Sequence, residues 1–168
     1  MLAVGATVTV EVTSPQVFGV FCRNASNEML VVIPETSWIT SFNSCLQFAE
    51  VGDLVTVKIL NIDTATGKIA ASIRALHPDP WETGKIVVGA SYDARVVRLV
   101  ESADRCNNKP AYLIELFPGA YAMLPAGDYK VSRGQYVKVR ILAADWRQSS
   151  VVVDWMYPSG EQRTEKGP

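Results

Sequence analysis

The sequence lacks most of what a catalytic or metal-binding site requires. Its one histidine, His77, is followed directly by a proline, so a serine or cysteine nucleophile would have no suitably placed base. No group of histidines, cysteines and carboxylates has the spacing of metal ligands, and no glycine-rich phosphate loop is present. We therefore expect no enzymatic activity, no catalytic residues, no bound metal and no cofactor.

Cysteines and long apolar runs are also scarce. Cys22, Cys45 and Cys106 lie far apart, form no CxxC pair and leave one cysteine over from any disulfide, which favours free thiols in a reducing cytoplasm. No apolar run approaches the roughly 18 residues that cross a membrane. The N-terminal residues alternate like a strand and have no basic lead, so a secretory signal is not expected. The sequence predicts a cytoplasmic protein without a membrane partner.

A strong charge of either sign is missing too. The chain carries 16 Lys and Arg against 17 Asp and Glu, a net charge of −1, so no overall basic field attracts nucleic acid. The charges are unevenly spread, with four basic and seven acidic residues in 1–80 and twelve against ten in 81–168. A polyanion would therefore be held by a local patch.

What the sequence does have is β-strand pattern. Residues 7–12 alternate with period two, and four more strand-like runs at 17–22, 29–33, 54–62 and 68–74 are separated by turn residues or proline. Residues 35–48 are too long for a hairpin turn and carry Trp38, Phe42, Leu46 and Phe48, so we expect them to form a compact segment that plugs one end of the fold. Five strands with this insert predict a small Greek-key barrel of the OB type.

The same pattern recurs 82 residues later. Residues 51–73 and 133–155 align without a gap and share six identities, among them Gly52/Gly134 and Asp63/Asp145. Val-Gly-Ala opens both copies, at residues 4 and 88. The fold class predicted is thus all-β, with two tandem five-stranded OB-fold barrels. We place the first at 1–76, a proline-stiffened linker at 77–87, a second, divergent barrel at 88–157 and a flexible tail at 158–168.

Several motifs of the first copy resemble the S1 RNA-binding domain family. They are Val17-Phe18-Gly19-Val20-Phe21, the run Leu30 to Glu35, the run from Val51-Gly52-Asp53 to Ser72, and Asp79-Pro80-Trp81-Glu82. The first copy matches along nearly its whole length, and the second mainly in its final hairpin. The resemblance implies that one barrel face binds single-stranded RNA, with Phe18 and Phe21 stacking on bases and Asp63 and Lys68 as a charged pair. The family's third-strand histidine corresponds to Val32, so one polar contact is missing.

Each candidate residue also has a structural alternative. Phe18 and Phe21 are three apart and would point to opposite faces of a regular strand, so either one of them is core or a bulge at Gly19 brings both to the surface. Lys58 and Lys68, expected to face each other across the last hairpin, and Arg23 in a turn could contact phosphate or serve only solubility. In the second copy the FGxF motif is absent, and the candidates are Tyr112 and a patch of Arg95, Arg98 and Arg140.

Two tryptophans of the second copy stay open between roles. Trp146 at a turn could stack or contact a partner, and Trp155 is expected to pack in a core or between barrels. The function predicted is single-stranded RNA binding with loose sequence preference, in translation or RNA metabolism and with the ribosome as a possible partner. The alternative is a protein-interaction module that docks on a ribosome, a polymerase or another RNA-associated complex.

Overall fold

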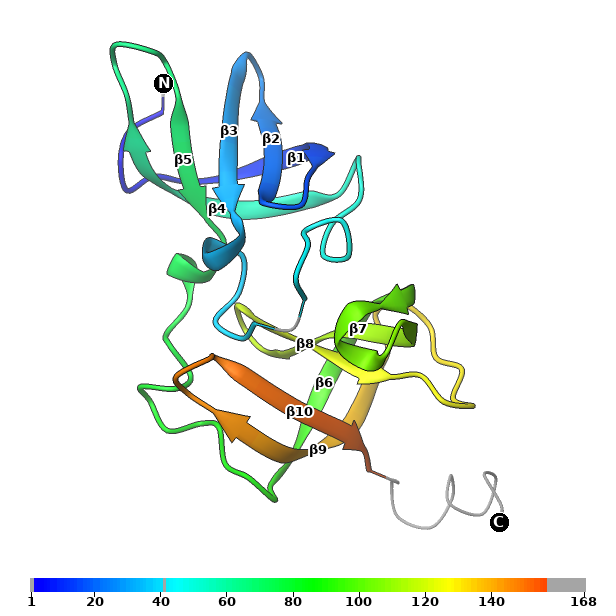
Figure 1. Ribbon diagram of the computed structural model, residues 1–168. Coiled ribbons are helices and arrows are strands. Elements are labelled where there is room, and N and C mark those ends of the chain that lie inside the picture. Colours follow the sequence, from blue (N-terminus) through cyan, green and yellow to red (C-terminus); the bar gives the residue numbers. More distant parts are fainter. Residues whose placement is uncertain (1, 41, 157–168) are drawn as a thin grey trace.

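The computed structural model describes residues 2–40 and 42–156, and its first half is a closed five-stranded barrel (Figure 1). We call this unit the first barrel. Its strands are hydrogen-bonded in the cyclic order β1-β2-β3-β5-β4. Four neighbouring pairs are antiparallel, and β3 and β5 are parallel, which is the topology of an OB fold. Its elements are β1 (Thr7–Pro15), β2 (Gly19–Asn24), β3 (Asn27–Val32), the 3₁₀ turn η1 (Ile33–Glu35), β4 (Leu54–Ile62), β5 (Ile69–Ser72) and the 3₁₀ turn η2 (Arg74–Leu76).

The second half forms a five-stranded sheet with the corresponding strand order, β10-β9-β6-β7-β8, which we call the second sheet. Among its described residues no hydrogen-bonded ladder joins the edge strands β8 and β10, which correspond to β3 and β5. They are linked instead by the Trp155 indole N–H, which donates to the Pro125 carbonyl at 2.6 Å. Its elements are β6 (Ser91–Ala103), the 3₁₀ turn η3 (Asp104–Cys106), β7 (Lys109–Phe117), β8 (Ala120–Pro125), β9 (Tyr136–Asp145) and β10 (Ser150–Trp155).

The two halves repeat the same local backbone bonds. In the first barrel the Gly5 amide donates to the Ile59 carbonyl at 2.8 Å, and in the second sheet Gly89 donates to Ile141 at 2.8 Å. The pair Gly52 and Gly134 likewise donates to β1 and to β6, and both glycines have positive φ angles of 94° and 87°. A side chain would be strained at these two positions, which explains why glycine recurs there.

Residues 36–53 connect β3 to β4 and pack between the two units, as the cyan segment in Figure 1 shows. Phe42, Cys45 and Phe48 belong to one buried cluster with barrel residues, and that cluster also contains Leu113 and Met123 of the second sheet. The Phe48 ring stacks on Phe42 and meets Tyr121 edge-on, with centroids 5.1 and 5.2 Å apart. The predicted plug therefore exists, and it also joins the barrel to the sheet.

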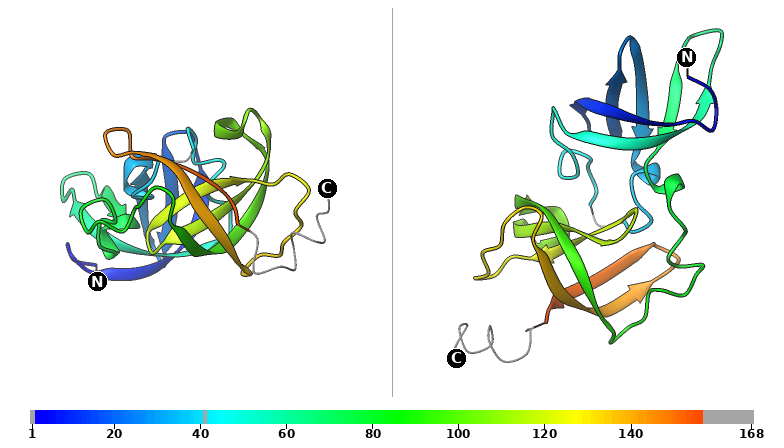
Figure 2. Two further views of the ribbon diagram at one scale, coloured as in Figure 1. Left: turned by 90° about the horizontal axis from the view of Figure 1, so that it is seen from below. Right: turned by 180° about the vertical axis from the view of Figure 1, so that it is seen from behind.

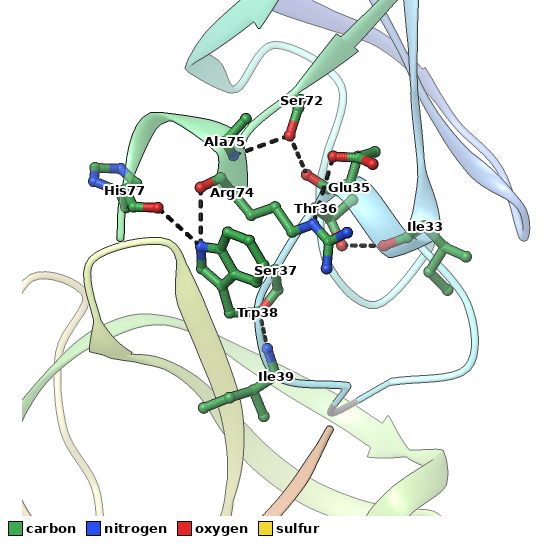
Figure 3. A network of polar contacts seen from close by, with 10 residues as sticks. All are labelled: Ile33, Glu35, Thr36, Ser37, Trp38, Ile39, Ser72, Arg74, Ala75 and His77. Carbon is green, nitrogen blue, oxygen red and sulfur yellow. Dashed lines mark hydrogen bonds and ion pairs between the residues drawn. The ribbon is translucent and has the colours of Figure 1, made fainter. Parts of the chain in front are cut away.

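A second connection runs along residues 77–90 on another side of the molecule (Figure 2). The Trp38 indole N–H lies 2.9 Å from the Arg74 carbonyl and 3.2 Å from the His77 carbonyl, and the Arg74 guanidinium lies 4.4 Å above the Trp38 ring (Figure 3). The Trp81 indole N–H donates to the Trp38 carbonyl at 2.8 Å. The linker is thus fastened to the insert by hydrogen bonds at this junction.

Candidate nucleic-acid interface

A groove of about 860 Å³ lies on the outside of the first barrel, along β3, β5 and the end of β4. Its floor is apolar because alternate strand residues point outward: Leu30 and Val32 of β3 and Leu60 of β4 remain accessible there, whereas Met29 and Val31 are buried in the core. Phe21 of β2 lines the same groove. An apolar floor that stays in contact with water suits the flat face of a nucleic-acid base or an apolar side chain of a partner.

Phe21 lies at one margin of this groove, and Phe18 packs against it. Their rings meet edge-to-face with centroids 6.0 Å apart; Phe18 is 53% exposed and Phe21 is half-buried. Neither of the two alternatives holds: both rings are accessible without a bulge at Gly19, because β2 begins at Gly19 and Phe18 lies in the bend before it. The register shift lies in β1 instead, between Val12 and Ser14.

Gly19 is required for this arrangement by close packing of the backbone. A β-carbon built at Gly19 would lie 2.6 Å from the Val31 carbonyl oxygen and 3.1 Å from the Val32 α-carbon, and neither backbone atom can move without breaking the β2–β3 ladder. The glycine lets β2 approach β3 next to the two aromatic rings.

Asp63 and Lys68 close one end of the groove at the β4–β5 turn. The Asp63 carboxylate accepts hydrogen bonds from the backbone N–H groups of Ala65 and Thr66 at 2.9 and 3.3 Å. The backbone N–H of Asp63 donates to the Lys68 carbonyl at 2.8 Å. A side-chain hydrogen bond from Thr66, these backbone bonds and the Lys68 charge hold the pKa of Asp63 below its usual value. Asp63 therefore builds the turn as an anion, and Lys68 lies beside it at the groove wall.

The groove wall carries more negative than positive charge. Lys68 is the one cation among its described lining residues, against Glu28, Glu35 and Asp63. Arg23 follows Phe21 by two on the exposed face of β2, opposite Glu11 and Glu28 in the ladders. Sequence reasoning did not anticipate the acidic wall, because only the fold places Glu28, at the start of β3, and Glu35, in η1, along the same groove.

Lys58 lies elsewhere. Its partner across the hairpin is Ser72, and it pairs with Thr7 of β1, so the expectation that Lys58 and Lys68 face each other is wrong. The cause is hairpin register: the Ile62–Ile69 pair closes the turn, so Lys58, in the middle of β4, lies opposite Ser72 and not opposite Lys68.

The face of the second sheet that corresponds to the groove is covered. Residues of β7 and β8 that point the same way as Phe21 and Leu30 include Ala111, Leu113 and Met123, and these are buried against the Phe42–Phe48 segment. Tyr112 points to the opposite side, is 6% exposed and contacts Trp155 edge-on. Tyr112 therefore cannot stack on a base, and the prediction for it fails because β7 is buried on both faces.

The three arginines expected to form a basic patch do not form one. The Arg98 side chain is 9% exposed and binds Asp53 at 2.6 Å and Glu50 at 3.4 Å, both from the first barrel, so it is a structural ion pair between the units. Arg95 pairs with Glu115 at 2.9 Å, and Arg140 lies exposed on β9. The prediction of Arg98 as an RNA contact is wrong, because its charge is already neutralised in a buried site.

Trp155 packs against the core of the second sheet. Its ring stacks on Tyr129 with centroids 4.0 Å apart and belongs to the cluster around Ile114 and Leu124. Cys22, Cys45 and Cys106 are free thiols. Residues 2–40 and 42–156 hold no group of three or more side chains placed to bind a metal ion. No helix in that part of the chain has the length and apolarity of a membrane span.

Sequence comparison finds relatives among ribosomal proteins. A small ribosomal subunit protein bS1 homolog of Bacillus cereus is 28% identical over 137 residues, which cover 74% of this chain and 34% of that protein. The small ribosomal subunit protein bS1 of Streptococcus pneumoniae is 27% identical over 153 residues, covering 84% and 36%. The chain thus spans about a third of the length of these relatives. No family model matches the chain.

Among solved structures, the chain is similar to part of an a/eIF2alpha–aDim2p–rRNA complex from Pyrococcus horikoshii, with a TM-score of 0.43, 19% identity and coverage of 51% of this chain and 52% of that one. It is also similar to GSP13 from Bacillus subtilis, with a TM-score of 0.42, 29% identity and coverage of 52% and 73%.

The fold and the groove define an all-β protein with OB topology. The sequence relatives are ribosomal protein S1 of several bacteria, so the resemblance to S1 domains is confirmed.

Proposed function

We propose that the first barrel binds single-stranded RNA in the groove that Phe21 lines. The observation that carries this proposal is the accessible Phe18–Phe21 pair at the margin of an apolar groove that ends at Lys68. An aromatic ring that stacks on a base contributes about 1–3 kcal/mol per base, and one lysine adds one phosphate contact. The similarity to ribosomal protein S1 supports nucleic-acid binding, and the role we propose is in translation or RNA metabolism in the cytoplasm.

Within residues 2–40 and 42–156, the first barrel offers the groove and the second sheet offers no counterpart of it. The corresponding face of the second sheet is buried by the first barrel's own insert, so the second sheet supports the barrel rather than offering an equal RNA face. Within the groove the carboxylates of Glu28 and Asp63 can accept hydrogen bonds from the amino groups of cytosine or adenine. Binding would rest on base stacking more than on phosphate contacts.

The test is a titration of the full chain with short poly-U and poly-A RNA. Replacing both rings (Phe18→Ala with Phe21→Ala) removes about 2–6 kcal/mol of stacking, an affinity loss of at least about 30-fold. Tyr136→Ala is the matched control, because Tyr136 is 66% exposed on the second sheet, away from the groove. Equal affinity of the double variant and the wild type, with both folded by circular dichroism, would refute the proposal.

A protein partner is the second candidate, and the acidic groove wall favours it. Glu35 is paired with Arg74, but Glu28 and Asp63 still outnumber Lys68 and disfavour a phosphate backbone, while exposed Val32 and Leu60 offer an apolar surface. A ribosomal or polymerase-associated protein with a basic, apolar segment would fit this surface. If no RNA binds at low salt and one stoichiometric protein is captured through wild type but not through the double variant, this second function replaces the first.

A further inference from the structure

The β9–β10 turn presents an aromatic side chain that the fold does not use. Trp146 is 69% exposed. In each of the three other tryptophans, Trp38, Trp81 and Trp155, the indole N–H donates to a backbone carbonyl. The Trp146 indole makes no such bond within the described part of the chain. A ring of this size in water contributes nothing to the core, so a binding role is the simplest physical reason for it.

A cation lies directly beside this ring. The Arg147 guanidinium carbon is 5.8 Å from the Trp146 ring centroid, and the Arg147 backbone N–H donates to the Asp145 carboxylate at 3.1 Å, which fixes the turn. Leu142 and Val152 on the same hairpin are 50% and 53% exposed. An accessible aromatic ring next to an arginine is the pair of groups that binds a base and its phosphate in single-stranded nucleic acid.

One residue of this turn also lines a second pocket, which lies at the junction of the barrel and the sheet. This second pocket, of about 340 Å³, is lined by Ile33, Pro34 and Arg74 from the first barrel and by Ser149 from the β9–β10 turn. The Ser149 N–H donates to the Trp146 carbonyl at 3.2 Å, and the Ser149 carbonyl accepts the Thr40 N–H at 2.6 Å. The turn is therefore held against the insert of the first barrel.

Neighbouring residues at the end of β3 and in η1 line the groove and this pocket. Val32 and Glu35 line the groove, and Ile33 and Pro34, which lie between them in the chain, line the pocket. The Arg74–Glu35 ion pair, 3.5 Å long, joins the two hollows, and Figure 3 shows the Arg74 guanidinium between Glu35 and the Trp38 ring.

We infer that Trp146 and Arg147 form a second stacking site for the same RNA strand, which leaves the groove at η1 and crosses the pocket beside Arg74. This inference rests on the proposed function of the groove. It makes the junction of barrel and sheet part of the binding surface, and assigns the second sheet a role at its β9–β10 turn rather than at the buried face that corresponds to the groove. A short oligonucleotide occupies the groove alone, and a longer one reaches both sites.

The test compares RNA lengths on the full chain. OB folds cover about 4 to 16 nucleotides, so oligo-adenylates of about 4 and about 16 nucleotides bracket the range. Trp146→Ala should weaken binding of the long RNA by about five- to 150-fold, equivalent to one lost stacking contact, and leave the short RNA unchanged. Trp146→Phe should recover most of the loss, because it keeps an aromatic face. Tyr136→Ala serves as the exposed aromatic control and should change neither.

The outcomes separate this inference from the proposed function. If the wild type binds both lengths and the Phe18/Phe21 double variant weakens both, while Trp146→Ala weakens neither, the second site is refuted and the groove stands. If the Trp146→Ala loss is equal for both lengths, the turn does not act as a distal site and the inference is overturned. If the wild type binds neither RNA, the groove proposal itself fails. Intrinsic fluorescence gives an independent signal, because quenching by the long RNA should disappear in Trp146→Phe.

Discussion

The salt dependence of RNA binding follows from how few cations the groove contains. Each phosphate that a protein cation neutralises on single-stranded nucleic acid contributes a slope of about −0.7 to log affinity against log salt. Lys68 lines the groove and Arg23 lies on the exposed face of β2, so one or two phosphates can be neutralised. We therefore expect a slope between about −0.7 and −1.4 for a short RNA of about four nucleotides.

The magnitude is small enough to be diagnostic. Raising monovalent salt from about 50 to about 200 mM should weaken wild-type binding only about 2.6- to sevenfold. Lys68→Ala should bring the slope about 0.7 closer to zero, and Lys58→Ala should leave it unchanged, because Lys58 does not line the groove. Fluorescence anisotropy at four or five salt concentrations measures both. A slope steeper than about −3 would refute the reasoning, since it would require cations that the groove does not have.

Three further predictions concern the body of the protein. The Phe48 ring is 6% exposed between the barrel and the sheet, so Phe48→Ala should lower the free energy of unfolding by about 3–5 kcal/mol, with one cooperative transition. A thermal unfolding curve in which the two units melt separately would contradict the shared core. Arg98→Ala should lower the free energy of unfolding by about 3 kcal/mol, because it removes the charge partner of Asp53, and should leave RNA affinity unchanged. Unchanged stability in denaturation together with weaker RNA binding would instead support the RNA role predicted from the sequence. Burial raises the pKa of Cys22 to about 11 and of Cys45 to about 12, so at pH 8 a thiol reagent should spare both until the protein unfolds and modify half-buried Cys106 first.

The buried face of the second sheet changes how the repeated sequence is understood. Tandem OB barrels could each offer a groove, and a longer RNA would then bind along equal sites. Here the insert between β3 and β4 covers the second groove position with Phe42 and Phe48, which are large apolar residues of the first unit. The repeat thus produces one groove and one supporting sheet.

Local pattern was enough to predict most of the fold. Leu54–Ile62 was predicted as a strand with its observed bounds, because it alternates in residue type and is followed by a turn sequence that ends in glycine. The repeat predicted β9 and β10 by the same reasoning. The positions of Phe18, Asp63 and Lys68 on the accessible side of the first barrel also follow from motif and turn chemistry.

The site predictions that failed share one physical cause: the alternation of apolar and polar residues along a strand does not reveal which of its faces packs against the other unit. Arg98 and Arg95 look alike in the sequence, three residues apart on one strand, yet one is buried against Asp53 and the other pairs within its own sheet. Tyr112 was predicted as a groove residue, but its side chain points into the core of the second sheet. The opposite face of β7 is covered by the insert of the first unit, so neither face of this strand can contact RNA.

Period-two alternation, turn glycines and the 82-residue repeat were thus sufficient to establish an all-β protein with strands in OB order, because these signals depend on neighbours along the chain. Only the tertiary structure decided that the second groove position is covered, that Arg98 is a structural ion pair and that Trp146 is exposed on a turn whose Ser149 lines a pocket beside Arg74. Those features depend on which surfaces of the two units meet, and the contacts involved join residues more than 40 positions apart.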